Sequence, residues 1–150
     1  MFWLEPGLPA SLAPGKRPRT TLTPSLVMRD GRPYMAFGSP GGDQQEQWSL
    51  MLFLRHVHFG LNLQQTIDLP MWQTSDIHSS FYPRNRVPFH LLAEETFGSQ
   101  AIDDLRARGH AVEVAPPHSV GRLAAVSAPG DGTLRAAATA SMMQAYAVGR

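Results

Sequence analysis

The sequence lacks cysteine, carries few charged residues and has no long apolar run. Without cysteine the chain forms no disulfide, no thiolate zinc site and no cysteine nucleophile. Charged residues make up 17% of the 150 residues, below the roughly 25% of an average soluble domain, so we expect part of the surface to be an interface. The net charge of +1 disfavours nucleic acid as a partner. The longest apolar run, residues 50–54, is far shorter than the roughly 20 residues of a membrane-spanning helix.

The N-terminus does not have the pattern of a secretory signal peptide. Residues 1–4 are followed directly by Glu5 and Pro6, so the basic, apolar and cleavage regions of such a peptide are all missing. A complete chain of this sequence is expected in the cytoplasm. A signal in a preceding segment would instead direct the protein to the periplasm or the outside of the cell.

The length predicts one domain spanning residues 1–150, in which residues 1–19 form an extended loop because four prolines and two glycines interrupt them. A hairpin is predicted from residues 22–28 and 33–37, since Asp30-Gly31 between them suits a tight turn. Residues 43–59 contain no Gly or Pro and predict a helix that ends at Gly60 and is apolar on most faces.

The second half alternates short elements. Asn62 and Gln65 form a capping box for a helix over residues 63–69. The remaining predicted elements are strands at 77–82, 89–92 and 111–115, a helix at 99–108, and a hairpin of 122–127 with 133–138. Two hairpins and interspersed helices indicate an α+β fold with largely antiparallel sheets.

The glycine-rich segment 38–42 joins a predicted strand to a predicted helix. Gly41 and Gly42 stand just before the free N–H groups of that helix, a position that favours negative charge. Two successive backbone amides there have the chemistry of an oxyanion hole or an anion site. The alternative is a tight turn with a purely structural purpose.

A second group of polar residues lies on the approach to the first strand. Lys16, Arg17, Thr20, Thr21 and Thr23 combine positive charge with hydroxyl groups, a set able to bind a carboxylate. Threonine is also a common strand residue, so a sheet edge with a basic loop is the alternative.

Other candidates carry less weight. Asp76, His78 and Ser80 would share one face of a strand, although neighbouring strand side chains rarely form a catalytic line. His56 and His58 diverge on a helix, so they are interpreted as packing or surface residues and no metal site is predicted. The paired methionines at 142 and 143 are interpreted as packing residues.

Several segments together resemble the C-terminal, small-subunit part of the gamma-glutamyltranspeptidase family. In chain order these are residues 14–24, 38–42 (Gly-Ser-Pro-Gly-Gly), 59–62 and 108–110. The resemblance implies a part of an αββα N-terminal-nucleophile hydrolase sandwich, whose precursor cuts itself to free an N-terminal threonine that attacks an amide. It also implies that Thr20 and Thr21 replace paired serines that hold the substrate carboxylate, and that Gly41 and Gly42 match the oxyanion-hole glycines. No metal or organic cofactor is implied.

The departures from the family pattern are equally specific. The chain begins downstream of the nucleophile segment, so the chain alone is expected to be inactive. Phe2 and Trp3 stand where the family has an acidic pair that holds the substrate's amino group, and Asp43 and Gln45 follow the glycines where other members differ. The resemblance implies a small gamma-glutamyl or related amide substrate, whereas these differences indicate a divergent branch acting on related amides or acylated amines.

The resemblance predicts acyl transfer or amide hydrolysis, with an upstream large subunit and nucleophile-bearing segment of the same precursor as partner. The alternative is a non-catalytic binding or assembly module derived from the same fold, and an unrelated small-anion-binding domain is a third interpretation. An incomplete domain is expected to expose sheet edges and apolar faces, which the missing segment or a homo-oligomer would cover.

Overall fold

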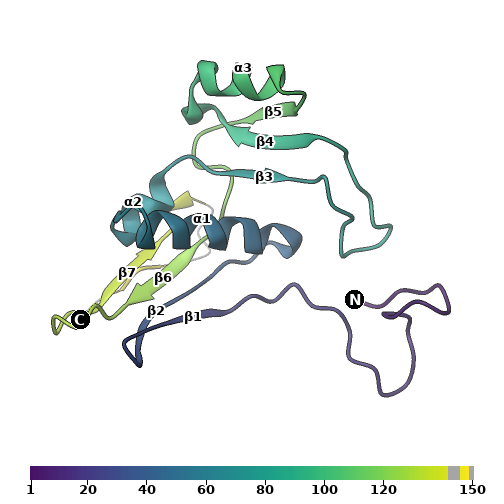
Figure 1. The fold of residues 1–150 in the computed structure, drawn as a ribbon, viewed down its shortest axis with the longest axis horizontal. Helices are drawn as coiled ribbons and strands as arrows, with labels where there is room; N and C mark the ends of the chain where they lie inside the picture. The colour runs from purple at the N-terminus through teal and green to yellow at the C-terminus, as the bar shows by residue number, and fades with distance from the viewer. Residues whose placement is uncertain (142–145, 149–150) are drawn as a thin grey trace.

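The computed structural model describes residues 1–141 and 146–148, so the prediction for Met142 and Met143 lies outside the described residues. The described chain builds two sheets with helices beside them (Figure 1). In chain order the elements are β1 Ser25–Arg29, β2 Arg32–Gly38, η1 Gly42–Gln44, α1 Gln45–Val57, α2 Leu63–Asp68, β3 Trp72–Thr74, β4 His90–Glu94, η2 Glu95–Phe97, α3 Ser99–Ala107, β5 Ala111–Ala115, β6 Ala124–Ser127 and β7 Arg135–Ala138.

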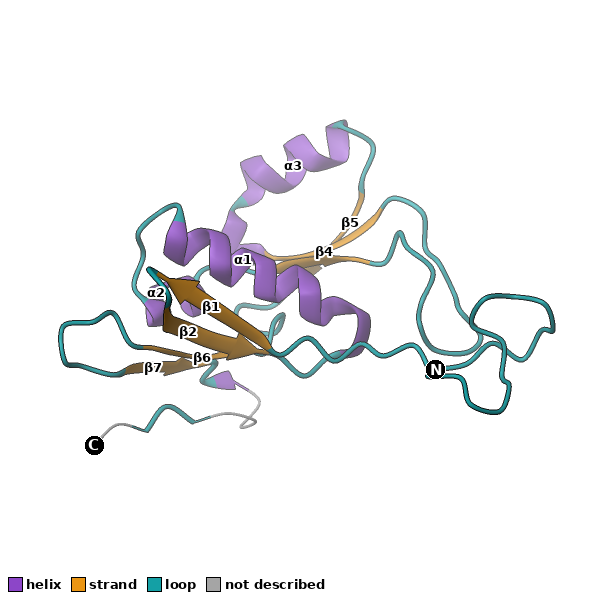
Figure 2. Cartoon of the chain, turned by 60° about the horizontal axis from the view of Figure 1, so that its bottom comes forward, coloured by secondary structure: helices purple, strands orange, loops and turns teal. Residues whose placement is uncertain are grey.

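The larger sheet has the order β1-β2-β6-β7 and is antiparallel throughout. It contains both hairpins predicted from the sequence. Asp30 and Gly31 take φ values of 51° and 74°, which is the left-handed conformation that a two-residue hairpin turn requires. Helices α1 and α2 lie over one face of this sheet (Figure 2). The α+β prediction is therefore confirmed.

Helix α1 lies within the predicted range and contacts the larger sheet, α2 and β3. Its buried residues are Gln45, Trp48, Ser49 and Leu52, which recur at helical spacing on one face. Leu50 is 57% exposed. Met51, Phe53 and Leu54 are half-buried, so the helix, whose sequence is apolar on most faces, has packing partners on more than one side.

The smaller sheet has the order β3-β4-β5, with β3 and β4 antiparallel and β4 and β5 parallel. Helix α3 forms the crossover that a parallel pair requires. The strand predicted at 77–82 is wrong, because the strand that pairs with β4 is β3. Residues 75–89 form a loop, and the backbone and serine hydroxyl groups of residues 79–87 bond within this loop and to Asp43.

The helix-boundary signals are confirmed at two further places. The Asn62 side chain accepts from the N–H of Gln65 at 2.9 Å, while the Gln65 side chain accepts from the N–H of Asn62 at 3.1 Å. Gly109 follows α3 with φ 97°, a conformation that favours glycine at the end of a helix.

The main core lies between α1, α2 and the larger sheet. Its most deeply buried apolar side chains are Met35, Leu52 and Leu123. Glu94 is also buried, at 2% exposure, and its carboxylate accepts from the N–H groups of Met71 at 3.2 Å and Val120 at 2.9 Å. This one side chain therefore fixes two loop segments that are distant in sequence against the end of β4.

Residues 1–19 have no helix or regular strand, as their prolines predict. The segment doubles back on itself, because Trp3 and Ser11 form an isolated β-bridge. The N-terminal ammonium group donates to the carbonyl of Arg19 at 2.7 Å. The loop therefore returns to the start of the 20–24 segment.

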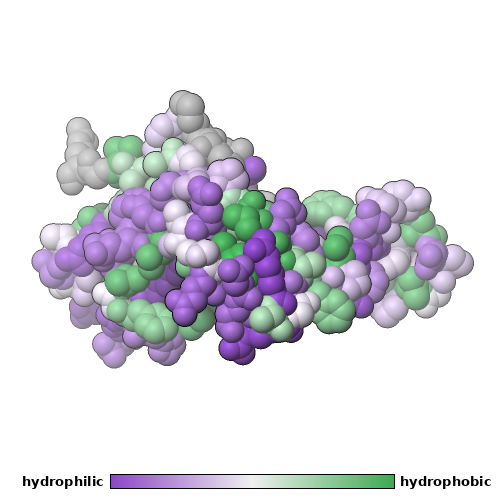
Figure 3. Space-filling view, turned by 90° about the horizontal axis from the view of Figure 1, so that it is seen from above, coloured by the Kyte–Doolittle hydropathy of each residue, from purple (hydrophilic) through white to green (hydrophobic). Residues whose placement is uncertain are grey.

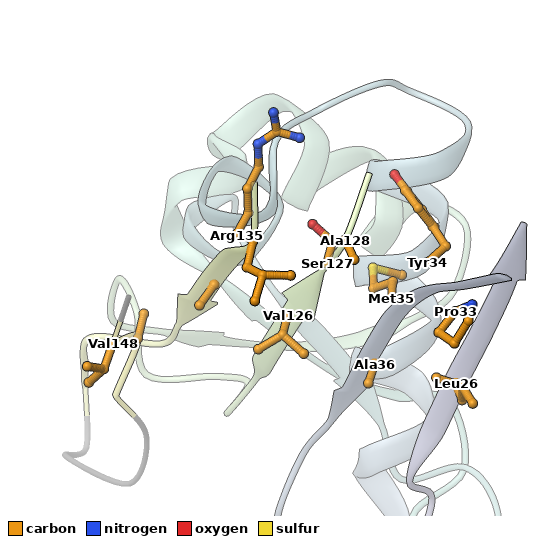
Figure 4. A pocket seen from close by; sticks show the side chains of 13 residues that line it. Leu26, Pro33, Tyr34, Met35, Ala36, Val126, Ser127, Ala128, Arg135 and Val148 are labelled. Carbon is orange, nitrogen blue, oxygen red and sulfur yellow. The ribbon is translucent and has the colours of Figure 1, made fainter. Parts of the chain in front are cut away.

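The outer face of the larger sheet, on the side away from α1, is apolar. Leu26, Ala36, Val126 and Ala136 are register partners on successive strands and form one row across the sheet. Leu26 is 64% exposed and Val126 is 54% exposed. A shallow cavity of about 580 Å³ lies over this row, with Val148 at its rim (Figure 4). We call this row the outer apolar row.

Seen from the side of α3, the surface is mostly hydrophilic with apolar patches between the polar side chains (Figure 3). Within the described ranges, no helix has the combination of length and apolarity needed to cross a bilayer.

Replacing the buried Glu94 is expected to destabilise the protein. Glu94→Ala leaves the N–H groups of Met71 and Val120 without their acceptors, which costs about 2–4 kcal/mol of unfolding free energy. Glu94→Gln keeps one acceptor and should cost less. Urea unfolding measures both, with exposed Glu95→Gln as the control. Equal stability of Glu94→Ala and the wild type would contradict this role.

Candidate functional site

The glycine turn, residues 38–42, connects β2 to η1 and α1 as the sequence predicts. Gly41 has φ 146° and Gly42 has φ 63°. A Cβ atom on Gly41 would lie 2.5 Å from the Trp48 ring, and one on Gly42 would lie 2.9 Å from the Phe81 ring. Both positions therefore require glycine for its backbone conformation and for the space around it.

Gln45 connects the glycine turn to the threonine segment. The side chain is 7% exposed, and its Nε2 donates to the carbonyls of Ser39 at 2.7 Å and Thr21 at 3.2 Å. In this orientation Oε1 accepts from the N–H of Gly42 at 3.0 Å. A single buried amide thus holds together two of the segments that the sequence singled out.

The hydrogen bond between Gln45 and Gly42 affects one of the two predicted oxyanion donors. The N–H of Gly42 points to Gln45 and already has an acceptor. The contact is one half of a capping box, because the Gln45 side chain accepts from the N–H three residues earlier while Gly42 has no side chain to bond in return. An incoming anion would have to compete with this side chain for Gly42.

The hydroxyl-bearing residues lie beside the turn with different exposures. Thr20 is exposed, and its Oγ1 accepts from the N–H of Leu22 at 3.1 Å. Thr21 and Thr23 are half-buried, and the Thr23 hydroxyl lies 3.3 Å from the Gln45 amide. Exposed Lys16 donates to the carbonyl of Pro9 at 3.2 Å, and Arg17 is exposed beside it.

Asp43 fixes the 75–89 loop against the glycine turn. Its Oδ2 accepts from the N–H of Ser80 at 2.7 Å and from the hydroxyl of Ser79 at 3.1 Å. Burial alone would raise the pKa of Asp43, but the interactions with Ser80 and Ser79 and the charge of Arg19 together lower that pKa below 3.8. The carboxylate is therefore already occupied by protein groups.

Arg84 attaches the same loop to the N-terminal segment. Its guanidinium donates to the carbonyl of Ser80 at 2.5 Å and to the carbonyl of Phe2 at 2.6 Å, and it stacks on the Trp3 ring at 4.0 Å from the centroid. Arg84 is 9% exposed, so these contacts replace water around the charge. Residues 20–23 and 79–84 therefore both contact the segment 38–45, and residues 1–3 are attached to the 79–84 segment through Arg84.

The structure does not bring Asp76, His78 and Ser80 together as a catalytic line. They lie in a loop, so the shared strand face on which that hypothesis depended does not exist. Asp76 pairs with Arg86 at 2.7 Å, His78 is exposed, and Ser80 is buried.

The two helical histidines also separate. His56 stacks on Tyr34 and bonds its hydroxyl at 2.6 Å, so it is the packing residue that the spacing indicates, whereas His58 is exposed. Across residues 1–141 and 146–148, no group of three or more His, Cys, Asp or Glu side chains is arranged to hold a metal ion.

Sequence reasoning missed the contacts of Gln45, Phe81 and Arg84. Gln45 carries a detectable signal, because it stands three residues after a glycine at a predicted helix start, as in a capping box. Phe81 and Arg84 carry none, since they approach the turn from a loop about 40 residues further along the chain.

Gly41→Ala is expected to destabilise the protein by at least about 2 kcal/mol, because the new methyl group meets the Trp48 ring and the φ of 146° disfavours a side chain. Gly38→Ala is a matched control, since nothing lies within 4 Å of a Cβ atom there, and it should change stability by less than about 1 kcal/mol. Thermal and urea unfolding measure both variants. Equal losses would contradict the packing described for Gly41.

Asp43→Asn tests the anchor of the loop through the pH dependence of stability. A carboxylate with a lowered pKa stabilises the fold above its unfolded value of about 3.9, and this contribution is lost as the pH falls through the folded pKa. The variant should be less stable than the wild type at pH 7, by about 1 kcal/mol, and the difference should shrink toward pH 3. Asp103→Asn, on exposed α3, is the control. A difference independent of pH would argue against the anchor.

Comparison with known proteins identifies relatives along the whole described chain. The family model for gamma-glutamyltranspeptidase matches residues 1–148. The oxamate amidohydrolase proenzyme of Klebsiella pneumoniae is 38% identical over 121 residues, which are 75% of this chain and 20% of that protein. The solved structure of LmbA2991HD is 53% identical and covers all of this chain, with a TM-score of 0.92, while the chain covers 27% of it.

A cephalosporin acylase from Bacillus halodurans has the same fold with a TM-score of 0.77 at 28% identity, over 93% of this chain and 24% of that one. The chain spans about a fifth to a quarter of the length of these proteins. The prediction of part of an N-terminal-nucleophile hydrolase fold is confirmed, and the interpretation as an unrelated anion-binding domain is wrong. From residue 1 to residue 148, the chain belongs to the gamma-glutamyltranspeptidase family.

Proposed function

We propose that this chain supplies the oxyanion-binding and substrate-binding part of an enzyme that transfers or hydrolyses the acyl group of a small amide. The observation that supports this proposal is the Gln45 amide, which joins the backbone of the threonine segment to the glycine turn. Two groups suited to opposite ends of an acyl donor, hydroxyls and backbone amides, are thereby kept at a fixed separation.

In the proposed reaction the nucleophile is an N-terminal threonine supplied by the upstream segment of the precursor. Its hydroxyl oxygen adds to the amide carbonyl, and its proton passes to the threonine's own amino group and then to the leaving amine as the C–N bond breaks. Water or an acceptor amine then attacks the resulting ester. No metal or organic cofactor takes part.

The role proposed for Gly41 and Gly42 is to bind the negative oxygen of the tetrahedral intermediate. An oxyanion is a stronger acceptor than the neutral amide of Gln45, so it takes over the N–H of Gly42 when it forms. Loss of one such donor typically slows acyl transfer by about 10²- to 10³-fold. Gln45 thus keeps the amide satisfied between turnovers.

Thr20 and Thr21 are proposed to hold the carboxylate of the substrate through their hydroxyls. Thr20 is exposed and Thr21 is half-buried beside the turn. The nearby Arg19 adds positive charge, and its field already lowers the pKa of Asp43. A donor with an anionic end would be attracted to this side of the site.

The outer apolar row is proposed to pack against the upstream part of the precursor. In an αββα sandwich two sheets pack face to face, and the exposed Leu26 and Val126 provide one such face. The helices α1 and α2 already cover the other side of the sheet (Figure 2). Homo-oligomerisation is the alternative way to cover this row.

Turnover of gamma-glutamyl and simple acyl anilides tests the proposed function. The chain of residues 1–150 should be inactive, and the same chain joined to its upstream coding sequence should release aniline after self-cleavage, because only the joined form contains the nucleophile.

Each outcome is informative. Activity of residues 1–150 alone would contradict the assignment of the nucleophile to another segment. A joined protein that folds and is processed but hydrolyses no anilide would favour the non-catalytic binding or assembly module.

A further inference from the structure

Two arginines lie directly opposite each other at the end of the first hairpin. Arg29 and Arg32 flank the Asp30-Gly31 turn and are register partners of β1 and β2. Both are exposed. Like charges in directly opposite positions of an antiparallel pair destabilise it. This end of the hairpin therefore carries two positive charges that repel each other.

In the part of the chain that the structure describes, neither arginine has a carboxylate partner. None of the ion pairs there includes Arg29 or Arg32, although Asp30 stands between them in the turn. Asp131, in the neighbouring loop, is already paired with Arg135. The positive charge of the hairpin end is thus left without a balancing anion by the described residues.

Arg29 is held in place by a chain of contacts that leads into the core. Its guanidinium stacks on the Tyr34 ring at 3.7 Å from the centroid. The Tyr34 hydroxyl bonds to His56 at 2.6 Å, and the other ring nitrogen of His56 bonds to the carbonyl of Leu61 at 2.7 Å. Stacking covers a face of the guanidinium, whereas its N–H groups point outward in the plane of the group. These donors are therefore positioned in advance for an acceptor.

The two arginines stand at one end of the outer apolar row. They line a cavity of about 700 Å³, and this cavity adjoins the one of about 580 Å³ over the row. Four residues line both cavities, namely Pro33, Tyr34, Ala128 and Leu134 (Figure 4). Leu134 is 84% exposed. The row and the arginines therefore form one continuous surface, apolar along the sheet and basic at the hairpin end.

We infer that Arg29 and Arg32 bind a carboxylate of the upstream part of the precursor, so that the segment covering the outer apolar row is apolar along the row and acidic at the hairpin end. This inference rests on the proposed function, which packs the upstream part on this row. The carboxylate accepts hydrogen bonds from both guanidiniums and thereby fixes the position of the covering segment along the row.

The charges decide which chemistry the occupant must have. A purely apolar segment over the hairpin end would take two like charges out of water without a partner, which is costly. A carboxylate pairs with both guanidiniums and removes their mutual repulsion. This chain covers only 20% of the oxamate amidohydrolase proenzyme and 27% of LmbA2991HD, so such proteins have further chain from which the segment can come.

Thermal unfolding of Arg32→Glu tests the inference in two forms, residues 1–150 alone and the same chain joined to its upstream coding sequence and processed. Alone, the new carboxylate faces Arg29, so Tm should rise by about 2 °C as repulsion becomes attraction. In the joined form it meets the acidic group of the covering segment, so Tm should fall by about 3 °C. The opposite signs are the expected result.

Two further variants separate charge from other effects. Arg32→Lys keeps the positive charge and should stay within about 1 °C of the wild type in the joined form. Arg106→Glu, on exposed α3, is the matched charge reversal away from this surface and should shift both forms equally. If residues 1–150 alone do not unfold cooperatively, the joined form decides, through the loss in Arg32→Glu and its absence in Arg32→Lys.

A lowered Tm in both forms would overturn the inference, because Arg32 would then stabilise the hairpin itself. An unchanged or raised Tm of the joined form would also overturn it, since no anionic group would face the arginines. Light scattering tests a second copy as the occupant. A dimer of residues 1–150 that Arg32→Glu converts to a monomer would overturn the assignment to the upstream part.

These measurements do not depend on turnover, so they separate the inference from the proposed function. Opposite Tm shifts in a joined protein that hydrolyses no anilide would support the acidic contact while the enzymatic proposal fails. An active joined protein whose Tm does not respond to Arg32→Glu would keep the proposed function and overturn the inference.

Discussion

The candidate site depends on the buried side-chain amide of Gln45. It is the one side chain that bonds to the Thr21 carbonyl, the Ser39 carbonyl and the Gly42 N–H among the described contacts. Because a buried amide with unpaired polar groups is costly, satisfying all three partners fixes the relative position of the threonine segment and the glycine turn. The separation of the Thr20 and Thr21 hydroxyls from the backbone amides of the glycine turn follows from this constraint.

Other buried side chains around the site also hydrogen-bond to backbone groups. Asp43, Arg84 and Glu94 each use a side chain that is partly or fully buried to bond backbone groups of segments distant in sequence. Loops lack the regular backbone hydrogen bonds of a helix or sheet. Hydrogen bonds from buried side chains to the loop backbone therefore determine the position of each loop. The 75–89 loop is thereby positioned against the glycine turn, and Phe81 with it. In the proposed function, the polar contacts that stabilise the fold are also the ones that position the site.

The larger sheet is covered by helices on one face only, and the longer relatives suggest what covers the other face. Helices cover one face, while Leu26 and Val126 leave the other apolar and open to solvent. This chain covers 20% of the oxamate amidohydrolase proenzyme and 27% of LmbA2991HD, so both of these proteins are several times longer than the matched part. An apolar face of this kind favours packing against further chain, which is the arrangement of a two-sheet sandwich.

Local signals in the sequence determined most of the elements. Asp30-Gly31 predicted the first hairpin. Asn62 and Gln65 predicted the start of α2, and Gly109 predicted the end of α3. These predictions hold because turn and cap conformations depend on residues within a few positions. The motif of glycines at 38–42 with threonines at 20 and 21 also identified the family. Tertiary structure alone decided that residues 77–82 form a loop, that the Gln45 amide bonds to the Thr21 carbonyl, and that Phe81 lies on the glycine turn. These outcomes depend on partners about 20 to 80 residues apart in the chain, and no local pattern specifies which buried polar group will find which backbone segment.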